Sequence, residues 1–255
     1  MLEHFLISQI FAFFLIFCRV GSGIMVLPGF GETYVSARIR LSLALIISLL
    51  LTPLLISTIP PIPASSLTLA LLITAEVLTG ILIGSICQIL ISIMHIAGTV
   101  LSVQAGVSSA VVFDVTQQSQ GSIIGNFLGI IAVVLIFTTN LHHVMIRGIT
   151  ESYTVFAPGK FPPIGDFAQT AAHMVSDTFN MAIQISAPLI IVGTLVFVGA
   201  GIISRLMPTM QVFFVIIAPQ LMVGFFIIIT TFSAFMLWSL EFYKDKLASF
   251  ITYLK

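Results

Sequence analysis

Residues 103–122 read VQAGVSSAVVFDVTQQSQGS and form a polar, flexible stretch between strongly apolar segments. The stretch holds four Ser, four Gln, two Gly and one Asp, where the flanking segments carry mostly Leu and Ile. At membrane depth, polar irregular backbone is tolerated only where protein buries it or where it lines a wet cavity. The sequence therefore predicts that this loop lies in or beside a conduit and that the apolar segments hold it there.

The composition around this loop is that of an integral membrane protein. Of the 255 residues, 58% are hydrophobic and 7% are charged, whereas about a quarter of a soluble domain is charged. The mean hydropathy is +1.20. The net charge is zero, so nothing indicates a nucleic-acid partner. Cys18 and Cys87 both lie in apolar segments, which predicts buried thiols and neither a disulfide nor a metal site.

Apolar runs dominate the rest of the chain, and most are long enough to cross about 30 Å of hydrocarbon as helices. They span residues 5–27, 39–59, 67–95, 123–137, 181–203 and 212–240. We therefore expect an all-α integral membrane protein with about six apolar helical segments. Residues 1–255 form a single domain in this prediction, with the polar loop at 103–122 and a polar connection at 151–180.

The second half of the polar connection predicts an amphipathic helix over residues 166–180. Asp166 is the expected N-cap, because its carboxylate can accept a backbone N–H of the first turn. Five apolar side chains recur at helical spacing and are expected on one face. They are Phe167, Ala171, Met174, Val175 and Phe179.

The membrane topology is not decided by charge. If all six segments span, one side holds three Lys and Arg residues in its connections and the other holds five, which is too small a bias for the positive-inside rule. Pro53, Pro188 and Pro219 also lie inside or near the ends of apolar runs, and each removes a backbone donor. Two explanations stay open: too few charges for the rule, or segments that are broken or hairpin-like and pack against partner proteins.

Three charged residues lie in or beside apolar surroundings, where a charge costs a few kcal/mol unless it faces protein or water. For Arg19 and Glu76 we favour an ion pair between helices over a proton relay. Asp114 is predicted to be functional, because it lies at the loop tip beside Phe113. Gly80 and Gly84, on the segment of Glu76, have the GxxxG spacing that permits close helix contact.

The sequence predicts no catalytic group, no metal site and no cofactor. Neither HExxH, GxSxG nor a Gly-rich phosphate loop occurs. His142 and His143 are adjacent, so on a helix their side chains point about 100° apart and do not easily chelate one metal.

The chain resembles the flagellar biosynthesis protein FliR family and its counterpart in virulence type III secretion. The resemblance covers nearly the whole chain and depends on the order of individually weak motifs. These are Arg19-Val-Gly21, Pro28-Gly-Phe-Gly31, Arg38, Leu43-Ala-Leu45, Glu76 with Gly80 and Gly84, Gln104-Ala-Gly106, Asp114, His143, the run from Ser204 to Phe213 that includes Arg205 and Pro208, and Pro219. The chain departs from the family pattern at Val115, Thr209 and Ile217.

The resemblance implies a subunit of the type III export gate in the bacterial inner membrane, at the flagellar basal body. Its implied partners are FliP, FliQ, FlhB and FlhA, membrane lipids, and unfolded flagellar proteins that pass through as substrates. The polar loop would act as a plug over residues 106–116. The plug residues expected from the resemblance are Gly106, Ser108, Ser109, Phe113 and Asp114, and packing or ion-pair roles fall to Arg19, Glu76, Gly80, Gly84, Arg205 and Pro208.

Two functions of other classes compete with the export subunit. A stand-alone secondary transporter would show inverted repeats and polar side chains converging at mid-depth; neither is clear, although Glu76 and Asp114 are compatible with it. An intramembrane enzyme ranks last, because Gly21-Ser22-Gly23 is not completed by any later catalytic motif.

Overall fold

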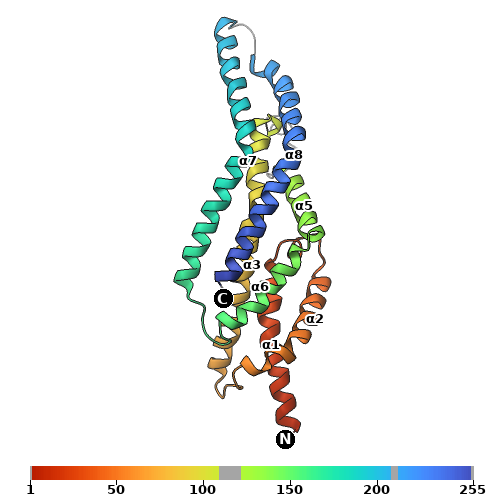
Figure 1. Ribbon diagram of the computed structural model, residues 1–255, viewed down its shortest axis with the longest axis vertical. Coiled ribbons are helices and arrows are strands. Elements are labelled where there is room, and N and C mark those ends of the chain that lie inside the picture. The colour runs from red at the N-terminus through yellow and green to blue at the C-terminus, as the bar shows by residue number, and fades with distance from the viewer. Residues whose placement is uncertain (1, 109–121, 208–211, 254–255) are drawn as a thin grey trace. The chain divides into compact units, whose positions relative to one another are not determined.

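The computed structural model describes residues 2–108, 122–207 and 212–253, and every regular element in these ranges is helical. Figure 1 shows α1 (Leu2–Val26), α2 (Ala37–Leu55), the short 3-10 helix η1 (Ile56–Thr58), α3 (Ser66–Gln104), α5 (Ile123–Thr138), α6 (Leu141–Val155), α7 (Ile164–Leu206) and α8 (Val212–Tyr253). Five helices are long and apolar enough to cross a membrane, and α5 with α6 forms a sixth candidate. The prediction of an all-α membrane protein with about six apolar segments is confirmed.

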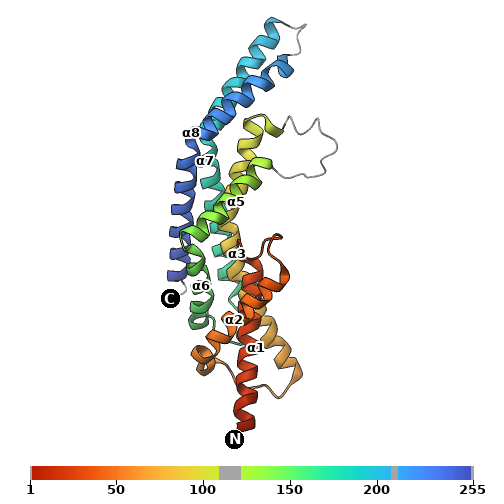
Figure 2. The ribbon, with the colours of Figure 1, turned by 90° about the vertical axis from the view of Figure 1, so that its right-hand side faces the viewer.

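The chain folds as two compact units. The first contains Met1–Leu90, Ile136–Val175 and Lys244–Lys255. In this unit α1 and α2 lie side by side in both views (Figures 1 and 2). Leu15 and Ile16 of α1, Ile83 of α3 and Met145 of α6 are almost completely buried. Their burial removes apolar surface of α1, α3 and α6 from the surroundings, which holds these helices together.

The second unit contains Ile91–Leu135 and Ser176–Tyr243. Its parts of α7 and α8 run side by side in both views (Figures 1 and 2). The core joins the end of α3, α5, α7 and α8, and its buried residues include Leu101, Leu128, Ile185 and Phe235.

Three helices are longer than their apolar runs predicted. The run at 67–95 continues as α3 to Gln104, the predicted amphipathic helix and the run at 181–203 are one helix, and α8 continues through the predicted tail to Tyr253. With 39, 43 and 42 residues, α3, α7 and α8 are each roughly 60 Å long, about twice the hydrocarbon thickness. Each of these three helices continues through the change from apolar to polar sequence that predicted a helix end, and its backbone hydrogen bonds are not interrupted there.

The prolines do not divide the helices either. Pro53, Pro188 and Pro219 lie inside α2, α7 and α8. Within the described ranges, the bent pair of helices is α5 and α6, and its break lies at Thr139 and Asn140. Asn140 has a left-handed backbone with φ of 60°, a conformation that Asn tolerates better than most residues.

The start of α7 corrects one detail of the predicted amphipathic helix. The helix begins at Ile164, so Asp166 lies in its first turn and is not the N-cap. There its charge still interacts favourably with the helix dipole. Of the apolar residues expected on one face, Met174 is buried, whereas Val175 and Phe179 are 51% and 55% exposed.

Candidate functional site

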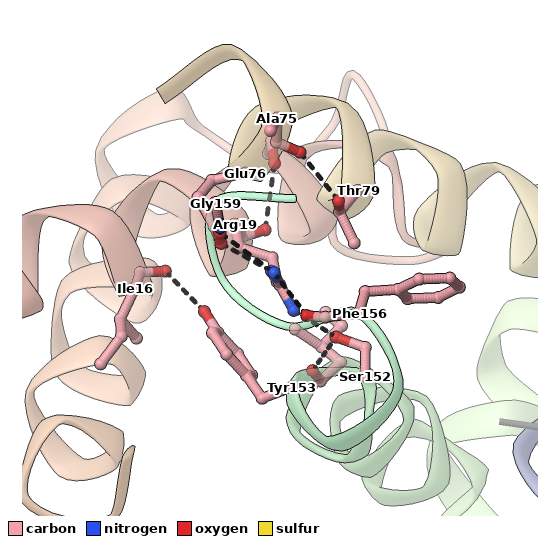
Figure 3. Close-up of polar contacts among 11 residues, drawn as sticks. Ile16, Arg19, Ala75, Glu76, Thr79, Ser152, Tyr153, Phe156 and Gly159 are labelled. Carbon is pink, nitrogen blue, oxygen red and sulfur yellow. Dashed lines mark hydrogen bonds and ion pairs between the residues drawn. The ribbon is translucent and has the colours of Figure 1, made fainter. Parts of the chain in front are cut away.

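A buried ion pair joins α1 to α3 in the first unit (Figure 3). Nε of Arg19 donates to Oε2 of Glu76 at 2.7 Å, and Nη2 donates to Oε1 at 3.1 Å. The two side chains are 0% and 1% exposed. This paired geometry matches the planar guanidinium to the carboxylate and is the strongest form of such a contact. The structure thus brings together the two charges that the sequence suggested as partners.

The other polar atoms of the pair are also satisfied (Figure 3). Nη1 of Arg19 donates to Oγ of Ser152 at 3.2 Å, and Nη2 also donates to the carbonyl of Phe156 at 3.1 Å. The backbone N–H of Gly159 donates to Oε1 of Glu76 at 3.0 Å. The cluster therefore links α1, α3, α6 and the segment that follows α6. A buried ion pair is tolerated when its remaining hydrogen-bonding capacity is met in this way.

An aromatic ring completes the cluster on α6. The guanidinium carbon of Arg19 lies 4.0 Å from the ring centre of Tyr153, a cation–π geometry. The Tyr153 hydroxyl points to the carbonyl of Ile16 at 3.5 Å. With every charged atom held by fixed neighbours, the arrangement favours a structural joint between helices over a proton relay.

Sequence reasoning missed Ser152, Tyr153, Phe156 and Gly159. They lie at the start of the segment that we read as a water-like polar connection, so nothing in their pattern marked them as buried. Gly159 has φ of 84°, which glycine adopts without strain and which turns its N–H toward Glu76.

The glycine pair on α3 sets the distance between α1 and α3. A Cβ on Gly80 would collide with Oγ of Ser22 and with the carbonyl of Arg19. A Cβ on Gly84 would lie 2.8 Å from Cβ of Val26. The backbones therefore meet at the predicted GxxxG pair, and Glu76 lies one turn before Gly80, within reach of Arg19.

A second arrangement, in the second unit, holds the start of the polar loop. α3 ends at Gln104, and Gly106 follows with φ of 78°. Nε2 of Gln220, from α8, donates to the carbonyl of Gln104 at 2.9 Å. Gln220 is 6% exposed, and its Cδ would lie 3.2 Å from a Cβ placed on Gly106. An amide buried among apolar helices thus holds the end of α3 in place.

Two further glycines let α7 and α8 pack closely against the end of α3. A Cβ on Gly193 of α7 would collide with Oε1 of Gln104. A Cβ on Gly224 of α8 would lie 2.6 Å from Cβ of Ala105. We call Gln104, Ala105 and Gly106, together with Gly193, Gln220 and Gly224, the loop root.

The other predicted site residues are less informative. Oγ of Ser108 donates to Oγ of Ser102 at 3.4 Å. Arg205 is exposed in the last turn of α7 and has no ion-pair partner in the described part of the chain; there its charge suits the helix C-terminus. The remaining predicted residues lie outside the described ranges. They are Ser109, Phe113, Asp114 and Pro208.

The loop root leads to a prediction for Gln220→Leu. Leucine is similar in length but cannot donate, so the buried Gln104 carbonyl loses its partner at a cost of about 1–3 kcal/mol. We expect a lower melting temperature of the purified protein, measured by circular dichroism in detergent. Gln184→Leu is the matched control, because Gln184 is an exposed amide on α7 whose side chain bonds Asn180 at 3.4 Å. Equal melting of the two variants would contradict the anchoring role.

Together these features define a class: helical membrane proteins that bury a fully hydrogen-bonded ion pair and hold the start of a polar loop against long apolar helices. The chain belongs to a family of this kind, the bacterial export proteins, family 1, whose model matches residues 10–245.

Relatives agree with the family assignment. The chain is 32% identical to the flagellar biosynthetic protein FliR of Caulobacter vibrioides, over 95% of this chain and 96% of that protein. It is 31% identical to the protein of the same name from Bacillus subtilis, over 87% and 86%. Identity to the one from Escherichia coli is 23%, over 81% and 78%. The family and these relatives identify a membrane-embedded subunit of the flagellar type III export apparatus, which works with other export proteins.

Proposed function

We propose that this chain is a structural, non-enzymatic subunit of the export gate in the bacterial inner membrane at the flagellar basal body. It helps to form and plug the channel through which unfolded flagellar proteins cross. It assembles with FliP and FliQ and works with FlhB and FlhA. The observation that carries the proposal is the loop root, where three long apolar helices hold the start of a polar loop.

The chemistry of the loop suits a plug. A channel for unfolded chains must open widely, yet it must hold back ions when idle. Gly and Ser residues let a loop rearrange at low strain, and apolar side chains close a pore by excluding water. In this proposal the plug comprises residues 106–116, with Phe113 as the seal and Asp114 as its polar neighbour.

The outer surface of the helices supports assembly with partners. α2, α7 and α8 expose large apolar side chains that only lipid or other subunits can cover. They include Leu49, Leu50 and Leu54 on α2, Leu195 and Ile202 on α7, and Met222, Phe226 and Ile229 on α8. Because α3, α7 and α8 are about twice as long as the hydrocarbon layer is thick, lipid tails cannot cover them all, and partner subunits supply the remaining cover.

The experiment that tests the plug removes residues 106–116. We expect the deleted protein to copurify with its partners while cells leak ions, because the conduit forms without its seal. A membrane-potential dye measures the leak, and copurification verifies assembly. A cell membrane as tight as wild type, around an assembled gate, would refute the plug role.

One of the two candidate residues of a stand-alone transporter, Glu76, already has a buried partner. It is 1% exposed and accepts hydrogen bonds from Arg19 and from the N–H of Gly159, which favours a structural role over ion coupling. Solute uptake by the purified chain in liposomes would nonetheless favour that alternative over the export gate.

A further inference from the structure

α3 and α5 meet at backbone distance within the second unit. A Cβ on Gly98 would lie 2.6 Å from the backbone N of Gly125. Oγ of Ser122 donates to the carbonyl of Gly98 at 3.0 Å and accepts the N–H of Gly125 at 3.0 Å. The two helices therefore pack through glycine and are connected by a hydroxyl at the point where α5 begins.

Both helices carry the same local pattern at this contact. In each, a polar residue is followed by glycine three positions later and by a second polar residue four positions later, so the three share one helix face. The sequences are HIAGTVLS at 95–102 and SIIGNFLG at 122–129. As a result, His95 and Thr99 of α3, Asn126 of α5 and Ser122, which directly precedes α5, lie beside the glycine contact. We call these four residues the polar edge.

The polar edge is open to the surroundings. His95, Thr99 and Asn126 are exposed and Ser122 is half-buried. The imidazole of His95 lies against α5, because a Cβ on Gly129 would be 2.7 Å from its Nε2. Its polar atoms therefore stand at the seam between two helices.

Most large exposed side chains elsewhere in this unit are apolar, although Asn180, Gln184 and Arg205 are exposed as well. Examples of exposed apolar positions are Ile191 and Leu195 on α7, and Met222 and Ile229 on α8. Those positions suit lipid or an apolar partner surface. Oγ1 of Thr99 donates to the carbonyl of His95 at 2.8 Å, and the Ser122 hydroxyl is held by Gly98 and Gly125. Leaving the imidazole of His95 and the amide of Asn126 against hydrocarbon would cost free energy for each unpaired group, so the polar edge requires an environment that forms hydrogen bonds.

We propose that the polar edge lines the water-filled path of the export gate and offers weak hydrogen bonds to the backbone of a passing, extended polypeptide. This proposal rests on the proposed function and names a surface that serves it. The edge carries hydroxyl, amide and imidazole groups and no carboxylate, ammonium or guanidinium. Such groups bind acidic and basic segments with similar, weak affinity, and conduction requires binding weak enough for release.

The position of the edge along the chain agrees with this role. α3 runs on from His95 and Thr99 to the loop root at Gln104, and Ser122 stands at the start of α5. A polar surface that continues from the polar edge to the loop root would bring both water and substrate to the start of the polar loop.

Cysteine accessibility in the assembled gate tests the proposal. In a background with Cys18→Ala and Cys87→Ala, we would compare Thr99→Cys and Asn126→Cys with Leu195→Cys, a 65% exposed position on α7. A charged, membrane-impermeant thiol reagent is applied to whole cells and to inverted membrane vesicles. Thiolates react in water and not in lipid, so we expect labelling of Thr99→Cys and Asn126→Cys at least about tenfold faster than of Leu195→Cys from one side. A substrate stalled in the channel should slow the labelling of Thr99→Cys and Asn126→Cys several-fold.

Two results would overturn the proposal. One is labelling of Thr99→Cys and Asn126→Cys as slow as that of Leu195→Cys from both sides, which would place the edge against lipid or a subunit. The other is fast labelling that a stalled substrate does not change, which would place the edge in water outside the path. Neither result bears on the leak caused by deleting residues 106–116, so a failure here is distinguishable from a failure of the proposed function. Copurification with the partner subunits verifies that each variant assembles.

Discussion

Glu76→Ala is expected to destabilise the first unit by about 3–5 kcal/mol, because it leaves the Arg19 guanidinium buried without its counter-charge. This is a large share of the about 5–15 kcal/mol by which a folded domain is stable. We therefore expect a strongly reduced amount of the protein in membranes, loss of motility and a much lower melting temperature. Immunoblotting of membrane fractions and thermal melting in detergent measure the two stability effects.

A second ion pair of the same unit is the control. Arg147 and Glu151 on α6 also pair at 2.7 Å, but the Arg147 side chain is 68% exposed. Exposed pairs one turn apart contribute only about 0.3–0.5 kcal/mol, so Arg147→Ala should be nearly neutral. The double replacement Arg19→Met with Glu76→Met removes both charges and should recover part of the lost stability. If Glu76→Ala were as mild as Arg147→Ala, the cluster would not be a structural joint.

Gly80→Leu is the second change with a large expected effect. Its side chain would have to enter the space that Ser22 Oγ and the Arg19 carbonyl occupy, and backbone cannot move aside as the end of a flexible side chain can. Overpacking of this kind costs about 1–3 kcal/mol or more, and separating α1 from α3 would also stretch the Arg19–Glu76 pair. We expect a lower melting temperature and less assembled complex, measured by melting and by copurification.

Glycines of α7 provide the matched control. Gly199 and Gly201 have no atoms within 4 Å of the position that a Cβ would take. Gly199→Ala and Gly201→Ala should therefore be neutral or stabilise the protein by up to about 1 kcal/mol, since alanine favours helix over glycine. Destabilisation by these changes equal to that of Gly80→Leu would show that helix contact at Gly80 is not the cause.

Sequence reasoning identified the charges of the buried cluster but not its polar neighbours. Arg19 and Glu76 stand out because a charge in an apolar run is costly and requires a partner. Ser152 and the carbonyl of Phe156 gave no such indication, since serine and backbone groups occur everywhere. Their role depends on where α6 ends relative to α1, which is a property of the folded chain.

The loop root shows the same limit. Gln104 and Gly106 belong to the polar stretch that was singled out from the sequence. Gln220 lies in the middle of an apolar run, and Gly193 and Gly224 look like ordinary small residues of membrane helices. Only the contact of their helices with the end of α3 shows that they hold the loop.

The amino-acid sequence alone determined that this protein is helical, resides in a membrane and carries a polar loop in an apolar frame. These properties follow from the transfer free energies of residues and from the need to satisfy every backbone group in lipid, and both are readable along the chain. The tertiary structure decided which groups meet: Arg19 with Ser152 and Phe156, Gln220 with Gln104, and Gly98 with Gly125. Such pairings depend on distances of a few ångströms between backbones far apart in sequence, and helical periodicity does not specify them.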